Sequence, residues 1–323
     1  MFWLFKAARR LRELGILGMN RRNAACILDH NPRARYPVVD DKLRMHALCQ
    51  EIGVPTPEVY AEISSYSMLR RLPELLGGRD DFVIKPNRGS AGRGVFVVVG
   101  RDGADYVRHN GEKVRLDALR QHLSDVLSGM YSLGGQLDRA IVQQRIRLHP
   151  AFAAVSYKGI PDVRVVLYRN EPAMAMLRLP TRESNGRANL HQGGIGTGVD
   201  LDSGRTHHAV QRNRFVDCHP DTGRPVVGLR VPYWGQVLSL SRRVAEAVGL
   251  GYVGVDVVID AERGPLLLEA NARPGLAIQI ANGRGLLPRL EAIDALLDRA
   301  PRLLPLGPAR RRRQPQEAHR QSA

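Results

Sequence analysis

The chain of 323 residues is 43% hydrophobic and carries a formal net charge of +16. This length and apolar content can bury a large core, so we expect one two-lobed unit or two domains. No run of 18 apolar residues is present and the N-terminus lacks a signal-peptide pattern, so we expect a cytoplasmic protein. Cys26, Cys49 and Cys218 are too scattered for a zinc site and indicate free thiols.

The basic residues are concentrated at the two ends of the chain. Residues 1–40 and 301–323 together carry ten of the sixteen net charges. Such a balance favours nucleic acid, an anionic membrane surface or a phosphate-rich substrate as a partner. Specific nucleic-acid binding is the weakest of these, because aromatic residues make up only 5% and no basic stripe crosses the middle of the chain. Residues 301–323 are predicted to be a basic, disordered tail.

Apolar residues recur at helical spacing over residues 1–17, with aromatic residues at the front and basic residues beside the apolar stripe. The pattern predicts a basic amphipathic helix that ends at Gly15 and Gly18. It is typical of an arm packed on the core and also of a helix on an anionic membrane surface, here the inner face of the membrane. Residues 20–39 are expected to be irregular, because Asn31-Pro32 and Tyr36-Pro37 interrupt them.

Separate strands and helices follow without a repeat. A helix is predicted from Asp40-Asp41, which can cap it, to Gly53, with Lys42 in its first turn. Later strands are predicted over residues 82–85, 95–99, 141–146, 162–168 and 173–179, and helices over residues 119–127, 237–248 and 286–297. Strand pairs interleaved with isolated helices indicate α+β lobes around antiparallel sheets rather than a doubly wound sheet.

Residues 82–100 place a glycine-rich loop between two predicted strands. Its glycines let backbone N–H groups approach an anion, and two arginines add charge, so a phosphate cradle and a flexible surface turn are the alternatives. The loop has neither the Gly-Lys-Ser/Thr of a Walker A loop nor the helix that follows a dinucleotide fingerprint. Lys85 ends an apolar strand directly before the loop, where a bound phosphate would supply the partner that its charge needs.

Residues 251–275 are the segment around which the rest is organised. They are predicted to form two short strands, over residues 252–260 and 265–271, joined by a polar turn of four residues. If Asp260 faces Pro265 across this turn, the strands form an antiparallel hairpin with a fixed register.

In this register Asp256 lies directly opposite Glu269, and Asn271 projects from the same face. Opposed like charges destabilise a sheet unless a cation lies between them. Hard oxygen ligands without Cys or His suit Mg²⁺, which usually shares its ligand shell with substrate phosphates, so the pattern predicts a Mg-nucleotide site. A hairpin with acids on a solvated face, or a register slipped by one residue, is the alternative.

Three further segments carry polar side chains suited to the same site. Asp162 and Arg164 share one face of a strand, as an exposed ion pair or as site residues. Residues 189–198 combine four glycines with the amide of Asn189, a density that costs stability unless the backbone takes special angles or approaches a ligand. Arg273, just past the last predicted strand, could direct its guanidinium at the metal and the phosphates.

Taken in chain order, these motifs resemble the ATP-grasp superfamily, and most closely the RimK-type α-L-glutamate ligases. The resemblance runs from about residue 40 to residue 276 and rests on Asp41-Lys42-Leu43, Ile84-Lys85-Pro86 with its glycine-rich loop, Val142–Ile146, Asp162-Val163-Arg164, Asn189–Gly194, Asp256 and Glu269–Gly275. The region Leu148-His149-Pro150 is also similar to an ATP-grasp group associated with polysaccharide-modifying gene clusters.

The resemblance implies an α+β ATP-grasp fold with the nucleotide between two antiparallel sheets. It implies a catalytic unit over residues 41–300 with a lid lobe at about residues 80–142, preceded by the basic N-terminal helix and irregular arm that the residue pattern predicts over residues 1–40. Only about 40 residues precede Asp41, too few for the full N-terminal domain with which many ATP-grasp enzymes bind substrate.

The resemblance also implies a role for each matching residue. Asp256, Glu269 and Asn271 would bind Mg²⁺, with Mn²⁺ as the alternative. The catalytic residues would be Arg164, Asn189 and Arg273, which steady the γ-phosphate and the acyl phosphate. ATP would be held by Lys42, Lys85, Arg88, Gly89, Ser90, Gly92, Gln143, Gln144, Arg145 and Ile146, although Gln144 stands where relatives often carry Glu.

The implied activity is that of an ATP-dependent carboxylate–amine ligase, which forms an amide or peptide bond through an acyl phosphate. The acid and the amine are not identified by the sequence. The alternatives are an ATP-grasp protein acting on a cell-surface or polysaccharide-linked substrate, and a membrane-surface scaffold that binds ATP without ligase turnover.

Overall fold

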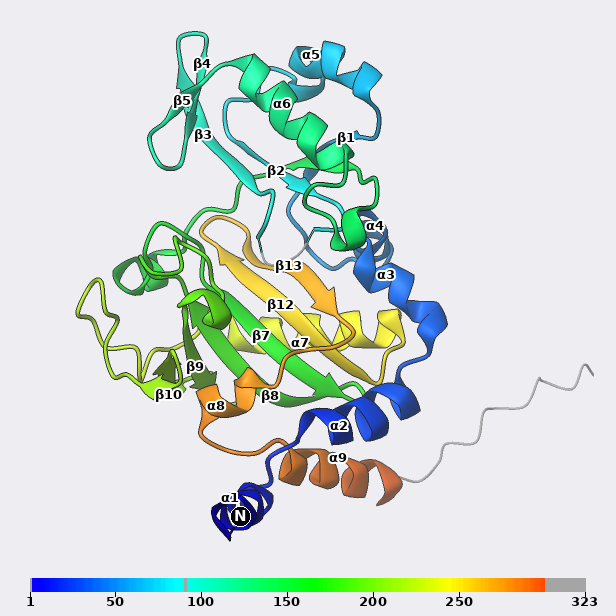
Figure 1. Ribbon diagram of the computed structural model, residues 1–323, viewed down its shortest axis with the longest axis vertical. Coiled ribbons are helices and arrows are strands. Elements are labelled where there is room, and N and C mark those ends of the chain that lie inside the picture. The colour runs from blue at the N-terminus through cyan, green and yellow to red at the C-terminus, as the bar shows by residue number, and fades with distance from the viewer. Residues whose placement is uncertain (1, 90–91, 300–323) are drawn as a thin grey trace, which may run out of the picture.

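The computed structural model describes residues 2–89 and 92–299, which form two lobes, each built on an antiparallel sheet (Figure 1). The larger lobe contains a seven-stranded sheet made of β7 (Asp162–Tyr168), β8 (Glu171–Leu179), β9 (Ile195–Val199), β10 (Thr206–Gln211), β11 (Arg214–Phe215), β12 (Tyr252–Asp260) and β13 (Gly264–Asn271). The strand order is β11-β10-β9-β8-β7-β12-β13, with every pair antiparallel. The predicted α+β class is confirmed.

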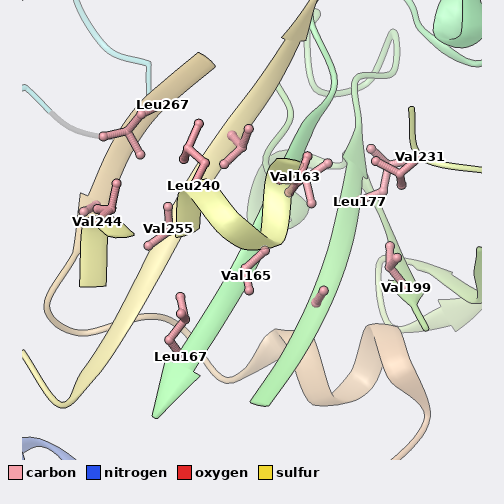
Figure 2. Close-up of a cluster of buried hydrophobic side chains, with 14 of the residues drawn as sticks. Val163, Val165, Leu167, Leu177, Val199, Val231, Leu240, Val244, Val255 and Leu267 are labelled. Carbon is pink, nitrogen blue, oxygen red and sulfur yellow. The ribbon is translucent and has the colours of Figure 1, made fainter. Parts of the chain in front are cut away.

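Helix α7 (Trp234–Val248) covers one face of this sheet and forms the main core with it. Its apolar stripe is buried against valines and leucines that alternate along the strands, and Figure 2 shows Leu240 and Val244 of the helix beside Val255 and Val165 of the sheet. Helices α8 (Ala277–Asn282) and α9 (Leu287–Arg299) pack on part of the opposite face. The rest of that face is left for the candidate site.

The smaller lobe lies above the first in Figure 1 and contains a six-stranded sheet in the order β1-β6-β2-β3-β4-β5. Its core forms where α6 packs on the sheet with α5. The elements are β1 (Val59–Ile63), α5 (Leu72–Leu76), β2 (Phe82–Pro86), β3 (Phe96–Asp102), β4 (Asp105–Arg108), β5 (Lys113–Val114), α6 (Leu116–Leu127) and β6 (Ala140–Gln143). The glycine-rich loop connects β2 to β3.

The predicted irregular segment over residues 20–39 is wrong, because most of it is helical. After α1 (Phe2–Glu13), the chain forms α2 (Met19–Arg21), a π-helix (Arg22–Leu28), a 3₁₀ turn (Arg33–Arg35), α3 (Tyr36–Asp40) and then α4 (Lys42–Glu51). Pro37 does not break α3, because it lies in the first turn, where a backbone N–H is not required. As predicted, Asp41 caps α4 by accepting hydrogen bonds from the N–H groups of Leu43 and Arg44.

The hairpin of β12 and β13 pairs Asp256 with Glu269 as predicted, but its turn differs from the predicted one. Asp260 faces Gly264 rather than Pro265, so the turn contains three residues, and Gly264 opens β13 with φ of +73°. A β-bulge then adds one residue, Leu268, to β13, which shifts the register back and places Glu269 opposite Asp256. The predicted pairing of the two carboxylates is confirmed.

The last four residues of the glycine-rich segment 189–198 belong to the buried strand β9. Its glycines are required by close packing within the chain: a Cβ on Gly196 would lie 2.5 Å from a methyl carbon of Leu190, and one on Gly198 would lie 2.7 Å from the carbonyl oxygen of Ala281. The predicted tail at residues 301–323 lies outside the described residues. Within the described ranges, no helix has the length and apolarity needed to cross a bilayer.

Candidate active site

Two lysines meet in a narrow cleft between the two sheets. Lys42 comes from the first turn of α4 and Lys85 from β2, and both line this cleft with Gln143 of β6 and Glu269 of β13. The volume of the cleft is about 30 Å³. The fold therefore brings together four predicted site residues that are spread over more than two hundred positions of the sequence.

Both lysines are held without a counter-ion. In the described part of the chain neither forms an ion pair with a carboxylate. Burial, and secondarily the charge of Lys42, lowers the pKa of Lys85 to about 7. Burial also lowers the pKa of Lys42, while the charge of Glu269 opposes that shift. An anionic ligand in the cleft would stabilise both cations.

The glycine-rich loop is fastened to α4 through Lys42. Its ammonium group donates hydrogen bonds to the carbonyl oxygens of Asn87 at 3.2 Å and Gly89 at 2.7 Å. Asp138 holds the loop from the other side by accepting a hydrogen bond from the backbone N–H of Arg88 at 2.9 Å. Ser90 lies outside the described residues. Gly92 lies beside Arg187, because a Cβ added to this glycine would be 3.6 Å from the arginine side chain.

Asn87 is a further polar residue at this loop that the sequence analysis did not select. It is fully buried, and its side-chain oxygen accepts a hydrogen bond from the N–H of Leu43 at 3.0 Å. Its Nδ2 group is buried without a partner among the described atoms. An orphaned donor is costly, and beside a basic glycine-rich loop it fits a phosphate oxygen. Its position directly after Lys85-Pro86 was the available sequence signal.

The two opposed carboxylates lie in different surroundings. Asp256 is fully buried, and both of its oxygens accept hydrogen bonds from Arg164, at 2.6 and 2.5 Å. Arg178 donates a further hydrogen bond to Asp256 at 2.7 Å. The side chain of Glu269 is 36% exposed and accepts a hydrogen bond from the amide of Asn271 at 3.2 Å, while Arg164 lies 3.9 Å away.

Arg178 on β8 also pairs with Asp162 on β7, and it was missed by the sequence analysis. The burial of Asp162 raises its pKa, although Arg178 opposes the shift. Burial acts against the ionisation of Asp256 too, but Arg164 and Arg178 outweigh it and lower the pKa of that carboxyl. The signal was a single charge inside the apolar strand MAMLRL, because a buried charge requires a partner.

Glu269 and Asn271 fit a magnesium ion better than Asp256 does. They offer two hard oxygen donors, and Mg²⁺ commonly uses one or two carboxylates together with waters and phosphates. Asp256 is less available, because Arg164 and Arg178 already donate hydrogen bonds to its two oxygens. In the described ranges, no three His, Cys, Asp or Glu side chains form a ready metal cluster.

The other predicted site residues have separate partners. The side-chain oxygen of Asn189 accepts a hydrogen bond from the N–H of His191 at 3.0 Å and caps a 3₁₀ turn. The guanidinium of Arg273 lies over the ring of Tyr36, 5.0 Å from its centre.

Of the described residues predicted to hold ATP, only Lys42, Lys85 and Gln143 line the lysine cleft, and the three that follow Gln143 lie outside it. Gln144 accepts a hydrogen bond from Arg263, and Arg145 forms a bidentate ion pair with Asp81 at 2.8 and 2.7 Å. Ile146 is half-buried outside the cleft. The backbone N–H of Gln144 also has a partner, because it donates a hydrogen bond to the carbonyl oxygen of Glu58 at 2.8 Å.

Comparisons with known proteins agree with this architecture. The chain is 26% identical to a probable alpha-L-glutamate ligase of Pseudoalteromonas translucida (strain TAC 125), over 76% of its own length and 59% of the relative's. It is 26% identical to the ribosomal protein bS6–L-glutamate ligase of Escherichia fergusonii, over 84% of its own length and 66% of the relative's. It thus spans about three fifths to two thirds of these relatives.

Among solved structures, a RimK domain ATP-grasp protein from Sphaerobacter thermophilus aligns with 82% of this chain and 70% of its own, with a TM-score of 0.44 and 16% identity. Residues 21–295 match the family model described as sugar-transfer associated ATP-grasp. This match covers most of the chain and bears out the resemblance to the ATP-grasp superfamily. The chain belongs to the sugar-transfer associated ATP-grasp family.

Proposed function

We propose that the protein is an ATP-dependent carboxylate–amine ligase. The observation that carries the proposal is the pair of half-buried lysines, Lys42 and Lys85, which face Glu269 across a cleft and form no ion pair within the described residues. Desolvated cations without a counter-ion are unfavourable, so they indicate a site for an anion. The ATP-grasp membership of the chain makes a nucleotide triphosphate the matching ligand.

In this proposal the phosphates of ATP take the place of carbonyl oxygens as partners of Lys42, and Lys85 binds them from β2. The Nδ2 group of Asn87 and the N–H groups of the glycine-rich loop, including Gly89 and Gly92, add hydrogen bonds, and Arg88 adds charge. Adenine contacts Gln143 and the backbone that follows it.

Glu269 and Asn271 would hold Mg²⁺ beside the phosphates, and Asp256 is the third candidate ligand. The ion would neutralise charge on the phosphate oxygens during phosphoryl transfer. Arg164, Asn189 and Arg273 would position the reacting groups. Closure of the loop at residues 88–94 would keep water from the acyl phosphate.

The proposed reaction has two balanced steps. A carboxylate oxygen of the substrate attacks the γ-phosphorus of ATP, so the bond to ADP breaks and an acyl phosphate forms. An amine nitrogen then attacks the acyl carbon, phosphate leaves, and the nitrogen loses one proton. Cationic side chains around the transferred phosphoryl group stabilise the charge that moves in both steps.

The names of the relatives and the description of the family suggest which classes of substrate to test. Names that include L-glutamate ligase favour an amino acid as one substrate. The family description, sugar-transfer associated, favours instead a substrate linked to a polysaccharide or to the cell surface.

ADP release should therefore be screened with acids and amines from both classes, including amino acids, dipeptides, hydroxy acids and sugar-linked acids. We expect Mg²⁺-dependent ADP release with one pair, and its loss in Glu269→Gln. Glu262→Gln is the matched control, because Glu262 lies on the exposed turn of the same hairpin with 65% of its side chain exposed. Equal turnover in wild type and Glu269→Gln would remove Glu269 from the site.

An anionic membrane surface is a second proposed partner, through α1. The described side chains of this helix, Lys6 and Arg9–Glu13, are exposed, and Leu11 is 51% exposed although the sequence places it on the apolar stripe. The helix is basic, which suits anionic lipid. We expect flotation with anionic vesicles, but not with zwitterionic vesicles, and loss of flotation when residues 1–17 are removed. Flotation of the truncated protein would contradict this assignment.

A further inference from the structure

The N-terminal arm, defined here as residues 19–40, contacts three consecutive residues that directly follow Asn271. Arg22 of the arm donates a hydrogen bond to the carbonyl oxygen of Pro274 at 3.1 Å. Asn31 donates one to the carbonyl oxygen of Ala272 at 3.0 Å. The residue between them, Arg273, lies over the ring of Tyr36. Three separate arm residues therefore hold one turn at the end of β13.

Asn31 joins this turn to the neighbouring strand. It is buried, and its amide exchanges two hydrogen bonds with the backbone of Tyr252 at the start of β12, at 2.7 and 2.8 Å. On the other side, an added Cβ on Gly254 would lie 2.7 Å from Pro274, so the turn packs directly on β12. The backbone on both sides of Arg273 is thus fixed by buried contacts.

The side chain of Arg273 depends on Tyr36 for its direction. Arg273 is exposed, and in the described part of the chain its guanidinium forms no hydrogen bond or ion pair. Tyr36 is half-buried and packs against the main core, so its ring is a fixed surface. A guanidinium that stacks on an aromatic ring contacts it through its flat face. Its N–H groups lie at the edge of the guanidinium and remain available to a phosphate.

We propose that the arm is part of the active centre and that Tyr36 is a positioning residue for Arg273. Tyr36 holds the guanidinium over its ring, two residues along the chain from Asn271, and the proposal places the transferred phosphoryl group within reach of this guanidinium. This inference rests on the proposed function, because it assigns Arg273 to that group. A purely structural role for Tyr36 would affect folding but would not distinguish between stages of phosphoryl transfer.

The test compares Tyr36→Leu, Tyr36→Phe and Arg273→Ala in the full chain. Tyr60→Leu is the matched control, because Arg79 lies 4.1 Å from the centre of that half-buried ring in the other lobe. The probes are Mg-ADP alone and Mg-ADP with aluminium fluoride, which mimics the transferred phosphoryl group and requires no acid substrate. Dissociation constants are measured with both probes, and thermal melting checks the fold.

We expect wild type and Tyr60→Leu to bind Mg-ADP more tightly when aluminium fluoride is present. Tyr36→Leu should lose about fivefold of this gain, as expected for a lost cation–π contact, with Mg-ADP affinity unchanged. Tyr36→Phe should keep the gain, and Tyr36→Leu should have no further effect in an Arg273→Ala background.

Several results would overturn the inference. They are a full fluoride-dependent gain in Tyr36→Leu, an equal loss in Tyr60→Leu, or no gain in wild type. Failure of wild type to bind Mg-ADP at all would instead refute the proposed function, so the two failures are distinguishable.

Discussion

The two sheets that face the candidate site use their cations in opposite ways. Lys85 of the smaller lobe and the neighbouring Lys42 of α4 are half-buried and form no ion pair in the described part of the chain, and burial lowers the pKa of both. On the larger lobe's side, Arg164 and Arg178 are nearly as buried, with 13% and 11% of their side chains exposed, yet both are paired with Asp256. One region holds unpaired cations and the other holds a satisfied network.

This difference indicates which residues support the fold and which serve a ligand. A paired buried network is destabilised when one member is removed, because the remaining charge is left without a partner. An unpaired buried cation already destabilises the protein, and its removal relieves that cost. We therefore expect substitutions in the two regions to change stability in opposite directions.

The largest effect is expected for Asp256→Asn. This change leaves Arg164, Arg178 and Asp162 as an unbalanced buried cluster, so the free energy of unfolding should fall by about 3–5 kcal/mol. Glu269 lies opposite Asp256, but its side chain is 36% exposed, so Glu269→Gln should change the free energy of unfolding by less than about 0.5 kcal/mol. Urea denaturation of both variants measures the difference. Equal, small effects would show that the arginine network does not support the fold.

A smaller effect of opposite sign is expected for Lys85→Met. In the absence of nucleotide this variant should be more stable than wild type by on the order of 2 kcal/mol, since it removes a desolvated amine. The folded pKa of about 7 lies below the ordinary value of 10.5, so the gain should be full below pH 7 and vanish above about pH 10.5. A loss of stability in urea denaturation at pH 6 would contradict the assignment of Lys85 as an unpaired cation.

The smallest effect is a protonation change on nucleotide binding. Phosphates beside Lys85 should raise its pKa from about 7, so at pH 8.5 binding of ATP takes up close to one proton. The affinity should then fall by up to about tenfold per pH unit above pH 7.5. Calorimetry in buffers of different ionisation enthalpy measures the uptake. Lys85→Arg should abolish it, and an unchanged uptake in that variant would assign the proton to another group.

Much of the larger lobe was predictable because its strands are long and apolar. Strand 162–168 and strand 252–260 have the predicted bounds. The opposition of Asp256 and Glu269 was also predicted, although from a turn one residue too long. Neither the three-residue turn nor the bulge at Leu268 has a clear signature in the sequence, and their effects on the register cancel at this rung.

The arm, β9 and the arginine network were not predictable in the same way. The prolines of the arm predicted interruptions of helical structure, but Pro37 lies in the first turn of α3, where a helix tolerates proline. The glycines of β9 indicated special backbone angles or a nearby ligand, whereas the structure packs Gly196 on Leu190 of the same segment and Gly198 on the distant Ala281. Arg178 gave a local signal, a charge in an apolar strand, but its partners Asp162 and Asp256 depend on strand order, which is a property of the folded sheet.

The central claim is that Mg-ATP binds between the sheets through the two unpaired lysines, and calorimetric titration with Mg-ATP tests it most directly. We predict saturable binding by wild type and a loss of about 10- to 100-fold in Lys85→Met, as for lost charge-assisted hydrogen bonds. Lys113→Met is the control, because Lys113 is 57% exposed and paired with Asp102, and it should bind as wild type does. Equal affinity in wild type and Lys85→Met, or no binding by wild type, would contradict the account.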